Sequence, residues 1–164
     1  MMKATGIVRR IDDLGRIVIP KEIRRTLHIR ESDPLEIFTD REGQVILKKY
    51  SPIGEMTTFA KQYAESLAQV SGHATLIADR DQFIAVSGGC KQLLNKSVSR
   101  QLEEKVNNRE TVIAAKGDRN YVNIAEDIAV DYAWQLITPI ICEGDIIGLS
   151  LIHISEPTRL ALIS

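Results

Sequence analysis

Apolar and polar side chains alternate in short runs through most of the first fifty residues, and turn residues separate the runs. Two runs before residue 20 and two after residue 34 predict strands, because side chains in a strand alternate between its two faces. A short helix is expected from Pro20, whose missing N–H is harmless in the first turn of a helix. The four predicted strands are 5–11, 16–19, 35–39 and 44–50, with turns at 12–15, 31–34 and 40–43.

This ββαββ segment of about fifty residues can form little core of its own, and it has no pair of cysteines that could staple it. Units of about fifty residues are marginally stable alone and often need a partner. Two interleaved copies would bury the apolar faces of both. We therefore expect a dimer through residues 1–53.

The alternating pattern breaks at Ser51–Gly54, which marks the predicted boundary between two domains. A linker helix is predicted over 54–71, because apolar residues follow at spacings of four and three. They are Met56, Ala60, Tyr63, Leu67 and Val70. Two interpretations stay open: a short coiled-coil seam between copies, or an amphipathic helix packed on its own domain. In either case the helix connects the two halves of the chain.

The second half contains several apolar runs and a helical segment. This pattern predicts an α/β domain over 72–148, with a single sheet and helices. The helix is expected over 97–107 with Ser97 as its N-cap. The loop Ser87–Gly89 lacks the Lys and the Ser or Thr of a phosphate-binding loop, so it is expected to be a plain turn. The predicted strands are 74–78, 83–86, 111–115, 121–124, 132–142 and 145–152.

The last sixteen residues, 149–164, form a separate case. The stretch 149–159, LSLIHISEPTR, resembles the translation of a sequencing adapter. We therefore expect residues 149–164 to be a non-native tail, with the natural sequence departing after about Gly148 and the domain truncated there. On this interpretation His153 has no role. The alternative is a genuine strand, because Leu149, Leu151 and His153 alternate acceptably.

Charge is distributed unevenly along the 164 residues, whose formal total is −1. The stretch Lys3–Arg30 carries eight basic and three acidic residues, 8 − 3 = +5, and six of the eight are arginines. Residues 51–164 carry ten basic and fourteen acidic residues, 10 − 14 = −4. Arginine forks fit phosphate oxygens and guanine edges, so the first stretch has the footprint of a nucleic-acid binder. Charge alone leaves a merely solvated surface as an equal alternative.

The remaining chemistry is sparse. Cys90 and Cys142 are far apart, which indicates no disulfide framework and fits a reducing cytoplasm, with Cys142 expected in the core. The three histidines have no metal-ligand spacing, and no cofactor is indicated. No apolar run approaches the ~18 residues of a membrane span. Paired acids occur only in predicted turns without a partner base, so the chain is not expected to be an enzyme.

The basic stretch carries a specific motif. Its members are Thr5–Arg9, Asp12, Leu14–Arg16, Val18–Pro20, Glu22–Arg25, Leu27, Ile29, Asp33 and Leu35–Ile37. Over roughly residues 3–53 the chain resembles the AbrB family of transition-state regulators, with His28 as the one local departure. The whole chain resembles members of that family that add a GAF-like domain.

That resemblance implies an α+β protein with an N-terminal swapped-hairpin β-barrel dimer, a linker helix and a GAF-like domain. It implies a DNA-binding regulator that activates and represses sporulation genes, contacting double-stranded DNA through Arg9, Arg16, Arg24 and Arg25. The GAF-like half would set the oligomeric state, up to a tetramer, and could take a small ligand. The alternative is an antitoxin that shares the N-terminal module. Antitoxins usually continue into a short disordered tail, whereas about ninety ordered-looking residues follow here.

Overall fold

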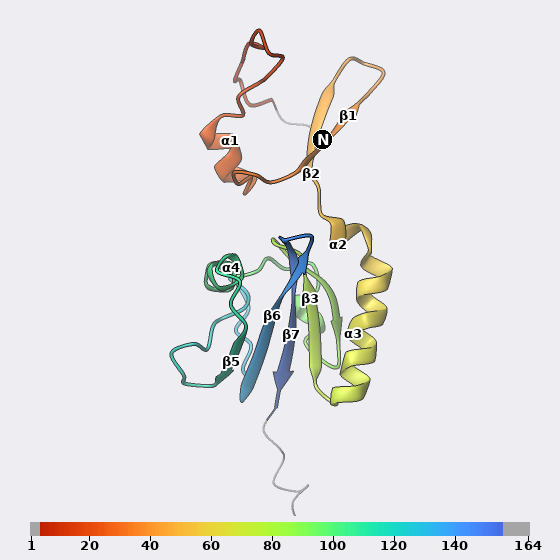
Figure 1. Cartoon of the computed structure of the whole chain (residues 1–164), viewed down its shortest axis with the longest axis vertical. Coiled ribbons are helices and arrows are strands. Elements are labelled where there is room, and N and C mark those ends of the chain that lie inside the picture. Colours follow the sequence, from red (N-terminus) through yellow and green to blue (C-terminus); the bar gives the residue numbers. More distant parts are fainter. Residues whose placement is uncertain (1–3, 156–164) are drawn as a thin grey trace, which may run out of the picture. The chain divides into compact units, whose positions relative to one another are not determined.

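The chain divides into two compact units, residues 1–50 and residues 51–164 (Figure 1). The structure is a computed structural model that describes residues 4–155. Each unit has its own secondary structure, and the order of elements is mixed α and β throughout. Within residues 4–155, no helix is both long enough and apolar enough to cross a membrane.

The N-terminal unit contains one short helix and one hairpin. Helix α1, Lys21–Thr26, follows Pro20, as the sequence predicts. Strands β1, Leu35–Thr39, and β2, Val45–Lys49, pair antiparallel. Asp40 fixes the turn between them, because its Oδ1 accepts the backbone N–H groups of Glu42 and Gln44 at 3.0 and 2.8 Å. This is the Asx chemistry expected of a polar turn.

The two strands predicted over 5–11 and 16–19 are absent from the single chain, which corrects the sequence prediction. The turn between them does form: the N–H of Gly15 donates to the Asp12 carbonyl at 3.0 Å. Across its base, the N–H of Asp12 donates to the Arg16 carbonyl at 3.0 Å. A strand exists only where a neighbouring strand accepts and donates its backbone hydrogen bonds. One copy of this chain supplies no such neighbour for either segment.

The N-terminal unit also lacks a core of its own. Pro20 is its only described residue that is buried. Apolar side chains are instead spread over the outside of the extended arms, the helix and both faces of the hairpin. Those with large exposure are Ile7, Val8, Ile11, Leu14, Ile17, Val18, Leu27, Ile37, Phe38, Val45, Ile46 and Leu47. So much exposed apolar surface is unusual for a unit that stands alone.

The C-terminal unit is built on a five-stranded antiparallel sheet in the order β4-β3-β7-β6-β5 (Figure 1). The strands are β3 Ala74–Ala78, β4 Phe83–Ser87, β5 Val112–Ala115, β6 Trp134–Cys142 and β7 Asp145–Ile154. The strand predicted over 121–124 is not formed, which is a second correction. That segment joins no ladder because it crosses above the sheet; the N–H of Ser99 donates to the Ile124 carbonyl at 2.9 Å.

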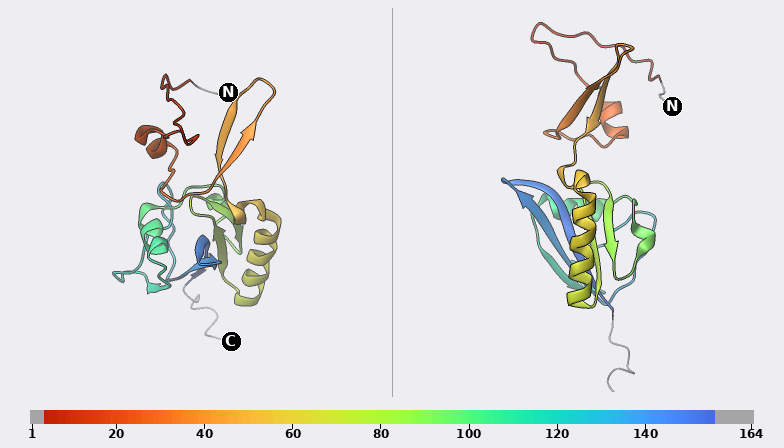
Figure 2. Two further views of the ribbon diagram at one scale, coloured as in Figure 1. Left: turned by 45° about the horizontal axis from the view of Figure 1, so that its top comes forward. Right: turned by 90° about the vertical axis from the view of Figure 1, so that its right-hand side faces the viewer.

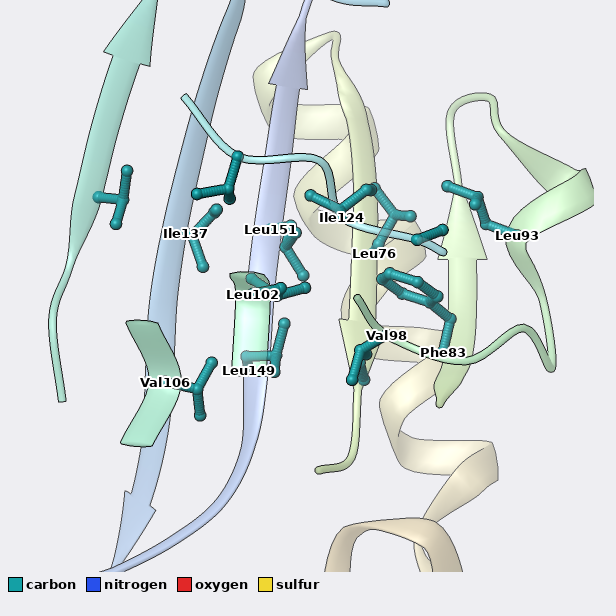
Figure 3. Close-up of a cluster of buried hydrophobic side chains, with 14 of the residues drawn as sticks. Leu76, Phe83, Leu93, Val98, Leu102, Val106, Ile124, Ile137, Leu149 and Leu151 are labelled. Carbon is teal, nitrogen blue, oxygen red and sulfur yellow. The ribbon is translucent and has the colours of Figure 1, made fainter. Parts of the chain in front are cut away.

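The main core lies on one face of this sheet (Figure 3). Helix α4, Arg100–Asn107, lies over that face, and Leu102 and Val106 are buried beneath it. Its N-cap is Ser99 rather than the predicted Ser97, with Ser99 Oγ accepting the N–H of Leu102 at 3.0 Å. A 3₁₀ turn, η1 Lys91–Leu93, covers the β4 side. The buried strand residues of this core are Ala74, Leu76, Ala78, Phe83, Val112, Ala114, Ile137, Leu149 and Leu151.

The opposite face is covered by helix α3, Thr57–Ser71, which follows a short helix α2, Pro52–Glu55 (Figure 2). Alanines at four-residue spacing, Ala60, Ala64 and Ala68, are buried, so the helix packs closely on β3 and β4. This confirms the packed-helix interpretation. The next flank of the helix is apolar and exposed, with Met56, Phe59, Tyr63 and Val70 on it. The rings of Phe59 and Tyr63 stack with centroids 6.3 Å apart.

Residues 149–154 have the geometry of a genuine strand, which was the alternative interpretation of this stretch. They form the second half of β7, which pairs with β3 on one side and β6 on the other. The non-native origin of the tail stays a prediction, and residues 156–164 lie outside the described chain.

The two cysteines differ in burial, and one of them corrects a prediction. Cys142 is exposed, which corrects the prediction, because β6 ends there and leads into the turn Glu143–Gly144. Cys90 is buried instead, and its Sγ lies 2.5 Å from the Tyr132 hydroxyl.

Candidate nucleic-acid interface

Asp12 organises the turn that carries Arg16. One carboxylate oxygen accepts the backbone N–H groups of Leu14 and Arg16, at 3.0 and 2.8 Å. The other accepts Nε of the Arg16 side chain at 2.8 Å. The backbone hydrogen bond from Arg16, and then its side-chain hydrogen bond, lower the pKa of Asp12. The ionised carboxylate therefore closes the turn and holds the Arg16 stem. The outer guanidinium nitrogens make no bond to Asp12, and the side chain is 68% exposed.

Gly15 makes this turn sharp enough to fold back. Its φ is +75°, and no atom lies within 4 Å of the position that a Cβ would occupy. The space is therefore free, but an L side chain would be strained in this backbone conformation. The turn Asp12–Gly15 thus sets Arg9 on one arm of the loop and Arg16 on the other.

Arg24 and Arg25 lie side by side in the last turn of α1, and both are exposed. The helix is held at its start by the N–H of Arg24 donating to the Pro20 carbonyl at 3.0 Å. It is closed at its end by the N–H of Ile29 donating to the Arg24 carbonyl at 2.8 Å. Basic side chains in a last turn also suit the helix dipole.

The four arginines predicted to contact DNA therefore lie on two pieces of the N-terminal unit. Arg9 and Arg16 flank the turn Asp12–Gly15, and Arg24 and Arg25 belong to α1. Within residues 4–155, Arg9, Arg24 and Arg25 have no ion-pair partner, so their charges are available to a ligand. The backbone N–H of the nearby Arg30 donates to Asp33 Oδ2 at 2.8 Å. This arrangement can neutralise phosphates, but it contains no base, nucleophile or acid set for catalysis.

The part that Asp12 plays was not predicted from the sequence. The sequence pattern predicted only that Asp12 lies in a turn. The structure shows that its carboxylate also positions the Arg16 side chain. The spacing Asp-x-x-Gly-Arg was the available signal, because an Asx turn at Asp12 followed by a fold-back at Gly15 brings Arg16 beside the carboxylate. The other paired acids behave alike: Asp79 Oδ1 accepts the N–H groups of Asp81 and Gln82 at 2.8 Å. Among the described residues, no group of three or more His, Cys, Asp or Glu could hold a metal ion.

Comparison with known families places most of the chain. Residues 55–161 match the family described as "Stage V sporulation protein T C-terminal, transcription factor". Residues 8–55 match the family described as "Antidote-toxin recognition MazE, bacterial antitoxin". The antitoxin alternative is not favoured, because this second match ends at the domain boundary and the larger remainder matches a transcription factor.

Individual relatives agree with this division. Stage V sporulation protein T of Bacillus subtilis (strain 168) is 55% identical over 158 residues, covering 96% of this chain and 88% of the relative. The transition state regulatory protein AbrB of the same organism is 43% identical over 108 residues, covering 66% of this chain and 93% of the relative. These matches confirm the resemblance to the AbrB family.

A solved structure identifies the fold of the C-terminal unit. The GAF domain of an Acinetobacter phosphoenolpyruvate-protein phosphotransferase superposes with a TM-score of 0.50 at 14% identity, covering 65% of this chain and 73% of that one. At this level of identity the likeness concerns the fold alone. The predicted GAF-like fold is confirmed.

Proposed function

Because this chain belongs to the stage V sporulation protein T family of DNA-binding transcription factors, we propose that it controls spore-formation genes through Arg9, Arg16, Arg24 and Arg25 of its N-terminal unit. Double-stranded DNA is the partner, and both activation and repression are expected. The domains are 1–53 for DNA binding, 54–71 as linker helix and 72–148 as GAF-like domain. The place of action is the cytoplasm.

The observation that carries this proposal is the set of exposed arginine charges on the turn and on α1. Phosphate contacts release condensed counterions, which supplies much of the affinity of a DNA-binding protein. Asp12 limits the freedom of Arg16, so less conformational entropy is lost when its guanidinium meets DNA. Arginines on a rigid turn and a helix end can also reach guanine edges.

A dimer through residues 1–53 is the second part of the proposal, and the bare apolar surface of the N-terminal unit supports it. Segments 5–11 and 16–19 have strand patterns but no strand partner in one chain. A second copy can supply strand partners for the backbone hydrogen bonds of these segments. It can also cover their exposed apolar side chains. Interleaving would then place two sets of four arginines on one particle.

The single substitution Arg24→Ala tests the interface. It removes two charges per dimer, so the slope of log K against log salt should become shallower by up to about 2 from a full value of about −7 for eight contacts. Affinity should fall about tenfold at low salt. DNA selected from a random pool, titrated by fluorescence anisotropy at several salt concentrations, measures both quantities.

Lys116→Ala in the C-terminal unit is the matched control, because Lys116 is exposed and pairs with Asp131 at 2.8 Å in an acidic region. It should leave the affinity and the slope unchanged. Circular dichroism should show both variants folded. Unchanged binding by folded Arg24→Ala protein would remove that residue from the interface. The same outcome at Arg9, Arg16 and Arg25 would refute the mechanism.

Tetramers are the third part of the proposal, and the exposed apolar flank of α3 supports it. Pairing of this flank between dimers would cover Phe59 and Tyr63, which a lone unit leaves stacked but half in water. Phe59→Glu should therefore reduce tetramers to dimers in sedimentation velocity, because a charge would replace an anchor of the contact. Gln62→Glu, on the polar side of the same helix, is the control and should remain tetrameric. A tetramer that survives Phe59→Glu contradicts this contact.

A further inference from the structure

A hollow lies in the C-terminal unit between α4 and the segment that follows β5, on elements that Figure 1 places next to each other. Its volume is about 290 Å³. This is near the lower end of the range for small-molecule sites. Its lining is polar except for two residues, and its members are Gln101, Glu104, Lys105, Asn108, Arg119, Tyr121 and Val122.

Both walls of the hollow are fixed by hydrogen bonds. The segment after β5 is tied down by Tyr121, whose hydroxyl donates to the Tyr132 carbonyl at 3.0 Å. It is tied again at Asn123, whose N–H donates to Gln101 Oε1 on α4 at 3.2 Å. Val122, on the floor, is buried and exchanges backbone hydrogen bonds with the Gln135 side chain at 3.4 and 3.1 Å. A site held on both sides needs little reorganisation to bind a ligand.

Arg119 is the basic residue on the lining that has no partner within the described chain. Neighbouring basic residues have partners: Lys105 Nζ lies 2.8 Å from Glu110, and Arg100 Nε lies 3.3 Å from Glu104. Arg109 donates to the Gly144 carbonyl at 2.6 Å. Arg119 has no such partner among residues 4–155, although the unit as a whole is acidic. A cation without a partner, beside a hollow in an acidic unit, is available for an anion.

The donors around the hollow agree with this. Lys105 spends one N–H on Glu110 and keeps two, and Gln101 uses its oxygen for Asn123 while its amide N–H₂ is left to donate. Together with the Arg119 fork they form a set rich in donors. Glu104 is the one carboxylate on the lining, and Arg100 already balances it. Donor-rich sites with arginine suit phosphate and carboxylate groups.

We propose that this hollow binds a small anionic metabolite, bearing a phosphate or a carboxylate, through Arg119 with help from Lys105 and Gln101. The proposal rests on the proposed function of the chain as a transcription regulator and on the expectation that its GAF-like half takes a small ligand, and it names the ligand class and the residues. The volume admits a molecule of the size of a sugar phosphate or a small dicarboxylate, not a dinucleotide. Glu104 can accept a hydroxyl of such a ligand at the rim.

Equilibrium dialysis of the full chain without DNA tests this, with labelled inorganic phosphate and labelled succinate in separate arms at constant ionic strength. Saturable binding of one site per chain is expected in at least one arm, and the arm that binds tells phosphate from carboxylate. Arg119→Gln should weaken it about tenfold or more, since a charge-assisted bond is lost. Arg119 is exposed, so the variant should fold normally.

The matched control is Lys91→Gln, which removes an exposed charge from η1, away from the lining. It should bind both anions as the parent chain does. Absence of saturable binding in both arms, or equal binding by Arg119→Gln, would overturn the proposal. DNA is not present in the assay, so this failure is separate from a failure of DNA binding.

Discussion

A chain carrying Ile37→Asp should lose dimerisation and DNA binding together. Ile37 lies opposite Leu47 in the β1–β2 hairpin and is 66% exposed in one copy. If a second copy covers it, the substitution forfeits about 2 kcal/mol of apolar burial and leaves a desolvated charge. It acts twice per dimer, so a loss of about 6 kcal/mol follows, or about four orders of magnitude in the dissociation constant.

DNA binding should fall with assembly because the eight arginine charges exist only when two copies join. A lone copy offers four, and its salt slope should drop from about −7 to about −3.6. Sedimentation equilibrium and anisotropy titration measure the two effects. Trp134, the only tryptophan, lies in β6 of the other unit, so its fluorescence checks that the C-terminal unit stays folded.

Thr58→Asp is the matched control, since it adds the same charge at an exposed position of α3. It should leave the dimer and the salt slope intact. If Ile37→Asp protein remains dimeric and binds DNA with the parent slope, the N-terminal unit does not assemble through this hairpin face. In that case the exposed apolar side chains of the unit need another explanation.

Local pattern predicted most of the elements because most of them depend on near neighbours. The hairpin at 35–50, helix α3 and strands β3, β4, β6 and β7 follow from alternation, turn residues and helical spacing. The segments 5–11 and 16–19 carry equally good strand patterns, yet they form no strand in one chain. The pattern indicates a preference for extended backbone, whereas a strand also needs a neighbouring strand, and one copy of this chain supplies none to these two segments.

The other differences between the predicted and observed elements depend on where the segments lie in the folded domain. The segment 121–124 is apolar because it lies over the core, where Val122 and Ile124 are buried. A buried segment without backbone ladder bonds can have the same alternation of apolar residues as a strand. Cys142 looked like a core residue because its run is apolar, but it ends β6 at a turn. Ser99 replaced Ser97 as the N-cap, a shift of two residues between two serines of equal capping ability.

The candidate sites also have parts that the sequence predicted and parts that only the structure shows. A basic stretch and a specific motif predicted four arginines, and their placement on a turn and a helix end followed from Gly15 and Pro20. The support that Asp12 gives to Arg16 needed atomic positions. So did the hollow beside Arg119, whose two walls come from separate segments of the chain. No spacing rule connects α4 with the segment after β5.

Acid should destabilise the C-terminal unit through His153. The side chain is 2% exposed on β7, and within the described chain neither ring nitrogen has a hydrogen-bond partner. Burial lowers the pKa of His153 from 6.5 to about 4. Its close neighbour is the Tyr132 ring, with centroids 4.6 Å apart. Burial, and then the hydrogen bond with Cys90, raise the pKa of Tyr132 to about 12, so that phenol stays neutral in acid.

The pH window follows from these values. Above pH 6.5 the imidazole is neutral in folded and unfolded chains alike, and its effect on stability is constant. Below pH 6.5 the unfolded chain takes up a proton that the folded chain accepts only near pH 4. The free energy of unfolding therefore falls by about 3 kcal/mol between pH 6.5 and 4, then levels off. Urea denaturation followed by Trp134 fluorescence at pH 7, 5.5 and 4.5 measures the loss.

His153→Leu should remove about 3 kcal/mol of this acid sensitivity and raise stability at pH 7, because two unsatisfied buried nitrogens give way to an apolar side chain. His73→Gln is the control. It alters a partly exposed histidine just before β3 and keeps His153, so it should retain the acid-induced loss. An equal fall in stability between pH 7 and 4.5 for His153→Leu and for the parent chain would place the acid sensitivity in other groups.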